Sequence, residues 1–222
     1  MSIAVKICGI TGPDAIDAAV SAGAVYGGLV FHPKSPRFVS LEQAAGLATR
    51  MRGRLKIVAL VADMDDAQLE TLVKTVRPDF LQLHGGETVQ RVAQIRERFG
   101  VAVIKALAVA EASDLDAAAD YEKVADMLMF DAKPPKGAER GGGHGGAFDW
   151  MLLKGRRFTK PWFLAGGLRP ENVATAIRAS GAKMVDVSSG VESAPGRKDM
   201  AEIMKFVMAA RTADAANDTV RA

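Results

Sequence analysis

The residues that could carry out chemistry in this chain are few, and most of them stand at the ends of short apolar runs. The single cysteine, Cys8, closes the first run, 3–8. His84 and Asp131 close two later runs, 81–84 and 128–131. A thiol, an imidazole and a carboxylate are groups that transfer protons in enzymes. These groups can act in one reaction only if the fold brings them close together in space.

Side-chain alternation predicts that these groups face a common interior. Successive residues of a strand point to opposite faces. The apolar set Ile3, Val5 and Ile7 therefore leaves Lys6 and Cys8 on the other face. Because Cys8 stands at the carboxyl end of its strand, we expect its thiol to point into the mouth of whatever the strands enclose.

Later runs repeat this arrangement. Gln82 and His84 alternate with leucines, and Asp131 follows a phenylalanine. Asp186 and Ser188 take the inward positions of the last run. Polar side chains from several strands thus converge on one rim, either as a reactive site or as a hydrogen-bonded structural layer.

The single groups each allow a structural and a chemical interpretation. Cys8 is either a small buried apolar side chain or a reactive thiol. An unpaired inward carboxylate is costly to bury, which favours an acid–base role for Asp131. His84 is a base, a substrate-positioning group or a structural histidine.

Two lysines belong to the same interior set. Lys6 shares the face of Cys8, and an outward Ile104 would place Lys105 inside as well. Both could be ion-pair partners of the interior carboxylates, and Lys6 is alternatively a substrate-positioning group. A lysine beside Cys8 would also lower the pKa of its thiol.

Two small-residue turns predict a phosphate site. Gly166 and Gly167 follow the seventh run, and Ser188, Ser189 and Gly190 follow the eighth. Glycine lets backbone N–H groups approach an anion, and a short helix after the eighth strand would add its positive end. We therefore expect a substrate that carries a phosphate monoester.

The segment 31–40 offers a second anion site. Arg37 follows a turn that contains two prolines and precedes a helix start at Ser40. A planar guanidinium suits a carboxylate, so Arg37 either binds a substrate carboxylate or is a solvated loop arginine.

The elements that must position these groups alternate regularly between strand and helix. Strands are predicted to begin near residues 3, 25, 56, 79, 102, 126, 162 and 183, and helices to span 12–22, 40–50, 65–76, 87–98, 111–121, 148–154, 170–179 and 198–210. Eight such units without antiparallel hairpins predict the α/β class and a single (β/α)8 TIM barrel.

We expect one catalytic domain, 1–211, followed by a polar, frayed tail, 212–222. The glycine-rich segment between Lys133 and Ala147 is either a mobile flap or a disordered surface loop.

Composition narrows the class of protein. The 222 residues carry 29 Lys and Arg against 26 Asp and Glu, a net charge of +3, and only 6% aromatic residues, which argues against a nucleic-acid surface. One cysteine excludes an internal disulfide and a multi-cysteine zinc site, and suggests a reducing compartment. The opening residues lack a signal-peptide pattern, and no apolar stretch reaches the roughly 18 residues of a membrane span. The expectation is a cytoplasmic protein with no membrane and no nucleic-acid partner.

Seven motifs, spread in order along the chain, resemble the phosphoribosylanthranilate isomerase family. They are Lys6-Ile-Cys-Gly9, Phe31-His-Pro-Lys-Ser-Pro-Arg37, Leu81-Gln-Leu-His-Gly85, Phe130-Asp-Ala-Lys133, Gly142-Gly-His-Gly145 with Phe148-Asp-Trp150, Ala165-Gly-Gly-Leu168, and Asp186-Val-Ser-Ser-Gly-Val-Glu192. One departure is His144, where a small polar residue is more usual.

The resemblance implies an Amadori rearrangement in tryptophan biosynthesis. It makes Asp131 the general acid that protonates the furanose ring oxygen, and Cys8 the general base that removes the C2′ proton. It also makes Arg37 the partner of the anthranilate carboxylate and assigns the phosphate to the two small-residue turns. It implies no cofactor and no metal.

Two other interpretations stay open. A related aldose–ketose isomerase of histidine biosynthesis performs the same chemistry, but that family resembles paired half-barrels that use carboxylates, whereas this chain has Cys8 and no clear half-chain repeat. A barrel that binds phosphorylated metabolites without turnover is the other. A monomer is slightly favoured over a homodimer.

Overall fold

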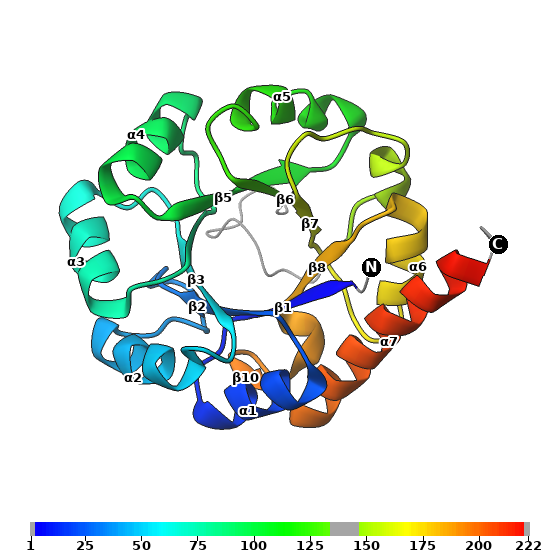
Figure 1. Cartoon of the computed structure of the whole chain (residues 1–222), viewed down its shortest axis with the longest axis horizontal. Coiled ribbons are helices and arrows are strands. Elements are labelled where there is room, and N and C mark those ends of the chain that lie inside the picture. Colours follow the sequence, from blue (N-terminus) through cyan, green and yellow to red (C-terminus); the bar gives the residue numbers. More distant parts are fainter. Residues whose placement is uncertain (1–2, 134–146, 220–222) are drawn as a thin grey trace.

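Eight parallel strands pair in the order of the sequence, and the last pairs with the first, so that the sheet closes into a barrel. Figure 1 shows helices around the outside of this barrel in the computed structural model, which describes residues 3–133 and 147–219. The strands are β1 (Ala4–Cys8), β2 (Tyr26–Val30), β3 (Lys56–Val61), β4 (Phe80–Leu83), β5 (Ala102–Val109), β6 (Met127–Ala132), β7 (Trp162–Leu164) and β8 (Met184–Val187). Each begins at the predicted residue or the one after it, and the predicted (β/α)8 fold is confirmed.

The outer layer is less regular than the sequence predicts. Its helices are α1 (Pro13–Ala22), α2 (Leu41–Met51), α3 (Asp66–Val76), α4 (Val89–Phe99), α5 (Ala118–Tyr121), α6 (Val173–Ser180) and α7 (Met200–Thr219), with 3-10 turns η1 (Ala112–Leu115), η2 (Trp150–Leu153) and η3 (Ser189–Val191). The helix predicted over 111–121 is divided between η1 and α5, and the one over 148–154 is only η2.

The last helix is longer than expected. We predicted an end near residue 210 and a frayed tail from 212, but α7 continues to Thr219. This stretch is rich in alanine, the residue with the highest helix propensity, which favours continuation.

Two apolar layers hold the barrel. One lies between the sheet and the helices, and includes Ile3, Val5 and Ile7, as alternation predicts. The other fills the barrel interior with Tyr26, Val58, Ile104, Ala106, Met129, Phe163 and Ala165. Tyr26 and Phe163 meet edge to face, with ring centroids 5.2 Å apart. Because these side chains fill the barrel interior, the polar groups lie at the carboxyl ends of the strands.

The expected position of Lys105 inside the barrel is wrong. Ile104 pairs in register with inward Gln82 and belongs to the interior cluster, so Lys105 points outward. There Lys105 Nζ donates to Glu87 Oε2 at 2.7 Å and to the Gly85 carbonyl at 2.7 Å. Alternation failed here because both faces of β5 are apolar and buried, which is common for strands of parallel sheets.

A hairpin that the sequence pattern did not predict follows β8. It consists of β9 (Glu192–Ala194) and β10 (Arg197–Lys198), which pair antiparallel. Gly196 turns the chain with φ of 80°, and a Cβ on it would lie 2.2 Å from the Pro36 carbonyl oxygen. The hairpin therefore packs closely against the loop that carries Arg37.

Candidate active site

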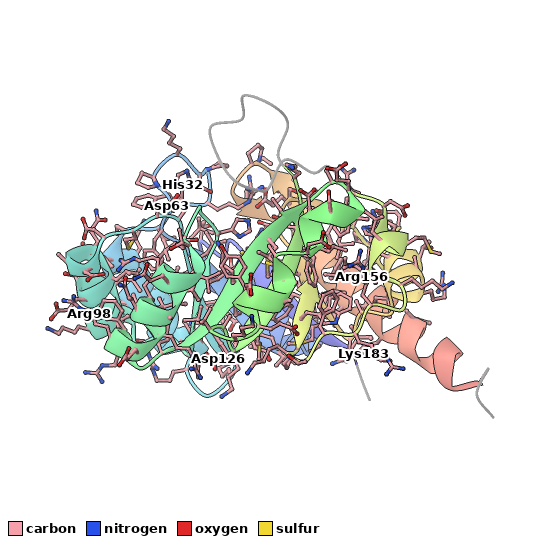
Figure 2. The ribbon with its side chains drawn as sticks, turned by 90° about the horizontal axis from the view of Figure 1, so that it is seen from above. His32, Asp63, Arg98, Asp126, Arg156 and Lys183 are labelled. Atoms are coloured by element: carbon pink, nitrogen blue, oxygen red, sulfur yellow. The ribbon has the colours of Figure 1, made fainter. Side chains whose placement is uncertain are left out.

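The carboxyl ends of the strands surround a cavity of about 480 Å³. Figure 2 shows the barrel from the side, with His32 and Asp63 on this rim and Asp126 and Lys183 at the opposite end. Most of the predicted site residues line the cavity, namely Cys8, Arg37, His84, Asp131, Gly166, Gly167, Ser188 and Ser189. Lys6 and Gly190 are not among its lining residues.

Lys6 forms a buried ion pair in the interior close to the thiol. Its Nζ donates to Asp186 Oδ1 at 2.8 Å, and the two residues are partners in the β1–β8 register. The interpretation of Lys6 as an ion-pair partner of an interior carboxylate is confirmed. Burial lowers the pKa of Lys6, but Asp186 and Cys8 raise it by more. Lys6 is therefore a charged, fully buried ammonium.

The thiol of Cys8 is buried and points into the cavity mouth, as alternation predicts. Burial raises its pKa, Lys6 acts to lower it, and Asp186 raises it further. The expected lowering of the thiol pKa is therefore wrong. Desolvation of the thiolate outweighs the attraction of Lys6, whose charge is balanced by Asp186.

Asp131 is held by a short chain of polar side chains. Its Oδ2 lies 3.1 Å from His84 Nε2, and its Oδ1 accepts a hydrogen bond of 2.9 Å from the Ala132 N–H. The other ring nitrogen, Nδ1, lies 2.9 Å from Gln82 Nε2. When the Gln82 amide donates to Nδ1, the hydrogen of the neutral ring is on Nε2 and points at the carboxylate. His84 thus orients Asp131 at the cavity wall.

The turn after β7 approaches β6 closely. Gly166 and Gly167 have φ values of 83° and 64°, in the left-handed region that favours glycine. A Cβ on Gly166 would lie 2.6 Å from the Ala132 nitrogen, so a side chain there would collide with the strand end that carries Asp131.

The turn after β8 meets the turn after β7. A Cβ on Gly190 would lie 1.9 Å from the Leu168 carbonyl oxygen, so only glycine allows the two turns to touch. Ser188 Oγ donates to the Cys8 carbonyl at 3.1 Å, which ties this turn to β1 as well. The expected short helix is only the single turn η3, which begins at Ser189. Backbone N–H groups, together with the Ser189 hydroxyl of the second turn, are therefore what these turns offer an anion.

Arg37 is buried, so the interpretation as a solvated loop arginine is wrong. Its Nε and Nη2 donate to the two carboxylate oxygens of Glu192 at 2.7 and 2.8 Å. Lys198 Nζ donates to the same carboxylate at 2.8 Å. Burial acts to raise the pKa of Glu192, but Arg37 and Lys198 together hold it below its usual range. Arg37 Nη1 takes no part in these bonds.

Three residues to which the sequence analysis assigned no role support the site. Gln82 lines the cavity, and Glu192 and Lys198 hold Arg37 and the turn after β8 from behind it. Glu192 ends the motif that begins at Asp186, which was the available signal, and Gln82 was recognised only as inward-facing. Lys198 lies in the unexpected hairpin, so no sequence pattern pointed to it.

The predicted flap falls mostly outside the described residues, because 134–146 are not described. Lys133 and Phe148, on either side of that segment, line the cavity. Within the described part of the chain, no group of three or more His, Cys, Asp and Glu side chains is arranged to hold a metal ion. Among the same residues, no helix is long and apolar enough to cross a membrane.

A family model and curated relatives of this chain name the same enzyme. The family model of N-(5′-phosphoribosyl)anthranilate (PRA) isomerase matches residues 5–209. The N-(5′-phosphoribosyl)anthranilate isomerase of Paramagnetospirillum magneticum is 56% identical over 211 residues, which cover 95% of this chain and 98% of the relative.

Solved structures agree with the sequence relatives. A crystal structure of monomers generated from the dimeric phosphoribosylanthranilate isomerase of Thermotoga maritima superposes with a TM-score of 0.82 at 33% identity, covering 95% of this chain and 99% of that one. A phosphoribosylanthranilate isomerase in complex with reduced 1-(o-carboxyphenylamino)-1-deoxyribulose 5-phosphate gives 0.81 at 32% identity, with the same coverage. The matches cover nearly the full length of both chains, and this chain belongs to the N-(5′-phosphoribosyl)anthranilate isomerase family.

Proposed function

We propose that this enzyme converts N-(5′-phosphoribosyl)anthranilate into 1-(2-carboxyphenylamino)-1-deoxyribulose 5-phosphate, with Asp131 as general acid and Cys8 as general base. The observation that carries the assignment of roles is that one cavity is lined by both groups, an arginine and two small-residue turns. A proton donor, a proton acceptor and sites for two anions are the parts that an Amadori rearrangement of this substrate needs.

Asp131 starts the reaction. It gives a proton to the furanose ring oxygen as the bond between C1′ and that oxygen breaks, and the ring opens to a protonated Schiff base. The bond to His84 Nε2 at 3.1 Å supports this role, because it fixes the direction of the carboxyl group at the cavity wall. After proton transfer, the same N–H stabilises the carboxylate that remains.

Cys8 completes the isomerisation. Its thiolate takes the proton from C2′, the C2′–H electrons form the C1′–C2′ double bond of an enolamine, and the iminium nitrogen becomes neutral. Transfer of the enol proton to the Asp131 carboxylate and return of a proton from the Cys8 thiol to C1′ then give the aminoketone and restore both groups. Burial raises the pKa of the Cys8 thiol in the free enzyme. A cationic Schiff base beside it would stabilise the thiolate, so the base forms most readily after ring opening.

The two ends of the substrate carry negative charges. The anthranilate carboxylate binds Arg37, whose Nη1 is left over from its bidentate pairing with Glu192. The phosphate binds the turns at Gly166 and Gly167 and at Ser188, Ser189 and Gly190. Gly190 itself acts by letting the second turn touch the first.

We further propose the compartment, the cofactor requirement and the oligomeric state of the enzyme. It acts in the cytoplasm, where a single thiol stays reduced, and it needs only proton transfers from its own side chains. The chain works as a monomer, although the related enzyme from Thermotoga maritima is dimeric. Light scattering of the purified protein at several concentrations tests this last point.

The experiment that tests the function generates phosphoribosylanthranilate in place and follows its fluorescence after the purified enzyme is added. Loss of signal with the parent protein, and none with C8A, is the expected result. No loss with a folded parent protein would contradict the proposed substrate. The next substrate to test would then be the corresponding aldose of histidine biosynthesis.

A further inference from the structure

A buried charged cluster lies directly behind the turn after β8. It consists of Arg37, Glu192 and Lys198, and its side chains are between 1% and 6% exposed. Two cations share one carboxylate, so one positive charge in the cluster is not balanced by Glu192. Burying such a charge is costly unless every donor finds an acceptor.

Lys198 meets that condition with three acceptors. Its Nζ lies 2.9 Å from the Ser188 carbonyl oxygen, 3.3 Å from Ser188 Oγ and 2.8 Å from Glu192 Oε1. Three acceptors around one nitrogen match the three hydrogens of an ammonium group. Burial lowers the pKa of Lys198, and the Glu192 carboxylate acts to raise it. Two of the three hydrogen bonds of Lys198 go to one residue, Ser188.

Ser188 is consequently held from two sides. While Lys198 donates to its carbonyl and hydroxyl oxygens, its hydroxyl donates to the Cys8 carbonyl at 3.1 Å. A carbonyl bound by an ammonium polarises the peptide unit that it shares with the next N–H, that of Ser189. This N–H belongs to the turn that lines the cavity.

We propose that Lys198 is a positioning residue for the phosphate end of the substrate, acting through Ser188 without touching the phosphate itself. It holds the turn in place, strengthens the Ser189 N–H as a donor and supplies a positive charge behind it. This inference rests on the proposed function, since it assumes that the turn binds the substrate phosphate.

The same carboxylate connects the two ends of the site. Glu192 binds Lys198 with Oε1 and Arg37 with both oxygens, so the turn expected to hold the phosphate and the arginine expected to hold the carboxylate share one anchor. Removing Lys198 leaves Arg37 and Glu192 as a balanced pair. We therefore expect the phosphate end to be weakened more than the carboxylate end.

The test compares Lys198→Met with the parent protein, using two probes that each contain one end of the substrate. Ribose 5-phosphate reports on the phosphate turns, and anthranilate reports on Arg37. Isothermal titration should show that K198M weakens ribose 5-phosphate by roughly tenfold, the size expected for a charge-assisted hydrogen bond, and anthranilate by less than about threefold. In the isomerase assay the KM should rise while kcat stays within a few-fold of the parent value.

Two further variants make the test specific. K198R keeps the charge and should recover most of the affinity for ribose 5-phosphate. K205M removes an exposed lysine that pairs with Glu202 on α7, and should bind both probes like the parent protein. If K198M fails to fold, K198Q takes its place, because its amide can still donate to the Ser188 carbonyl without the charge.

The outcomes separate this inference from the proposed function. Unchanged affinity of K198M for ribose 5-phosphate, or a lower kcat at constant KM, would overturn the role of Lys198 alone. A folded parent protein that binds ribose 5-phosphate at no concentration up to tens of millimolar would overturn both the inference and the phosphate site on which it rests.

Discussion

Lys6 and Asp186 are paired across the seam of the barrel, where β1 meets β8, and their side chains form an ion pair of 2.8 Å in the interior next to Cys8. Because the two charges balance each other, the thiol gains less from Lys6 than a lone lysine would give it. Burial then decides the direction in which the pKa of Cys8 moves, which is upward.

This relationship predicts the reactivity of the thiol. The rate of alkylation of Cys8 by iodoacetamide follows its thiolate fraction. We expect this rate to be low at pH 7 and to keep rising above pH 9, where an ordinary thiol with a pKa of about 8.5 is already mostly ionised. Mass spectrometry of the protein labelled at several pH values measures it, with glutathione as reference. A plateau below pH 8 would contradict a raised pKa.

The proposed acid and base should affect turnover much more than binding. C8A and D131A should each lower kcat by a factor on the order of 10² to 10⁴, with affinity for the reduced product analogue largely kept. Steady-state kinetics and titration of that analogue measure the two quantities. Asp120→Asn is the matched control, since Asp120 is an exposed carboxylate that pairs with Lys123. Near-normal turnover in either variant would remove that residue from the mechanism.

Arg37 should act on binding. R37A should raise KM by roughly 10- to 100-fold, because it removes a charge-assisted contact to the anthranilate carboxylate. Glu192 keeps Lys198 as a partner in this variant, so the fold should survive. R50A, which alters an exposed arginine that pairs with Asp17, is the comparison. The same KM in R37A and R50A would mean that Arg37 does not contact the substrate.

Glu192 should make the protein sensitive to acid. Its pKa is lowered in the folded state, so the stability that it contributes is present above its ordinary pKa of about 4.3 and is lost as the pH falls through the folded value. The Tm of the parent protein should therefore drop steeply between about pH 5 and pH 3. E192Q should have a lower Tm at pH 7 and a shallower drop.

A second glutamate provides the control for this pH dependence. Glu70 also has a lowered pKa, caused by Lys74, but it is exposed, so solvent screens the pair. E70Q should give a Tm profile close to that of the parent protein between pH 3 and pH 7. Parallel profiles for E192Q and the parent protein would contradict the role of the buried cluster in acid stability.

Alternation along the strands was enough to predict that Cys8, His84 and Asp131 share one cavity. Each of their strands has one apolar face and one mixed face, so the direction of every side chain followed from its position. In β5 both faces are apolar, and the same rule placed Lys105 on the wrong side. Only the register with β4 decides that direction, and register is a property of the closed sheet.

The pairing of Arg37 with Glu192 could not be predicted in the same way. The two residues are 155 positions apart, and they meet because a short hairpin folds back over the loop of Arg37. The raised pKa of Cys8 was missed for a related reason. Lys6 lies on the same strand as Cys8, so the sequence shows that the two are close. Asp186, which balances the charge of Lys6, comes from the other end of the chain.

The contact between Gly190 and the Leu168 carbonyl has a consequence for protein engineering. With no room for a single Cβ between them, the turns after β7 and β8 cannot vary independently in shape. A graft that replaces one turn with that of another barrel would have to bring the other turn as well. The two turns can therefore be transplanted only together. A chimaera whose junction falls between them should lose the close contact between Gly190 and Leu168.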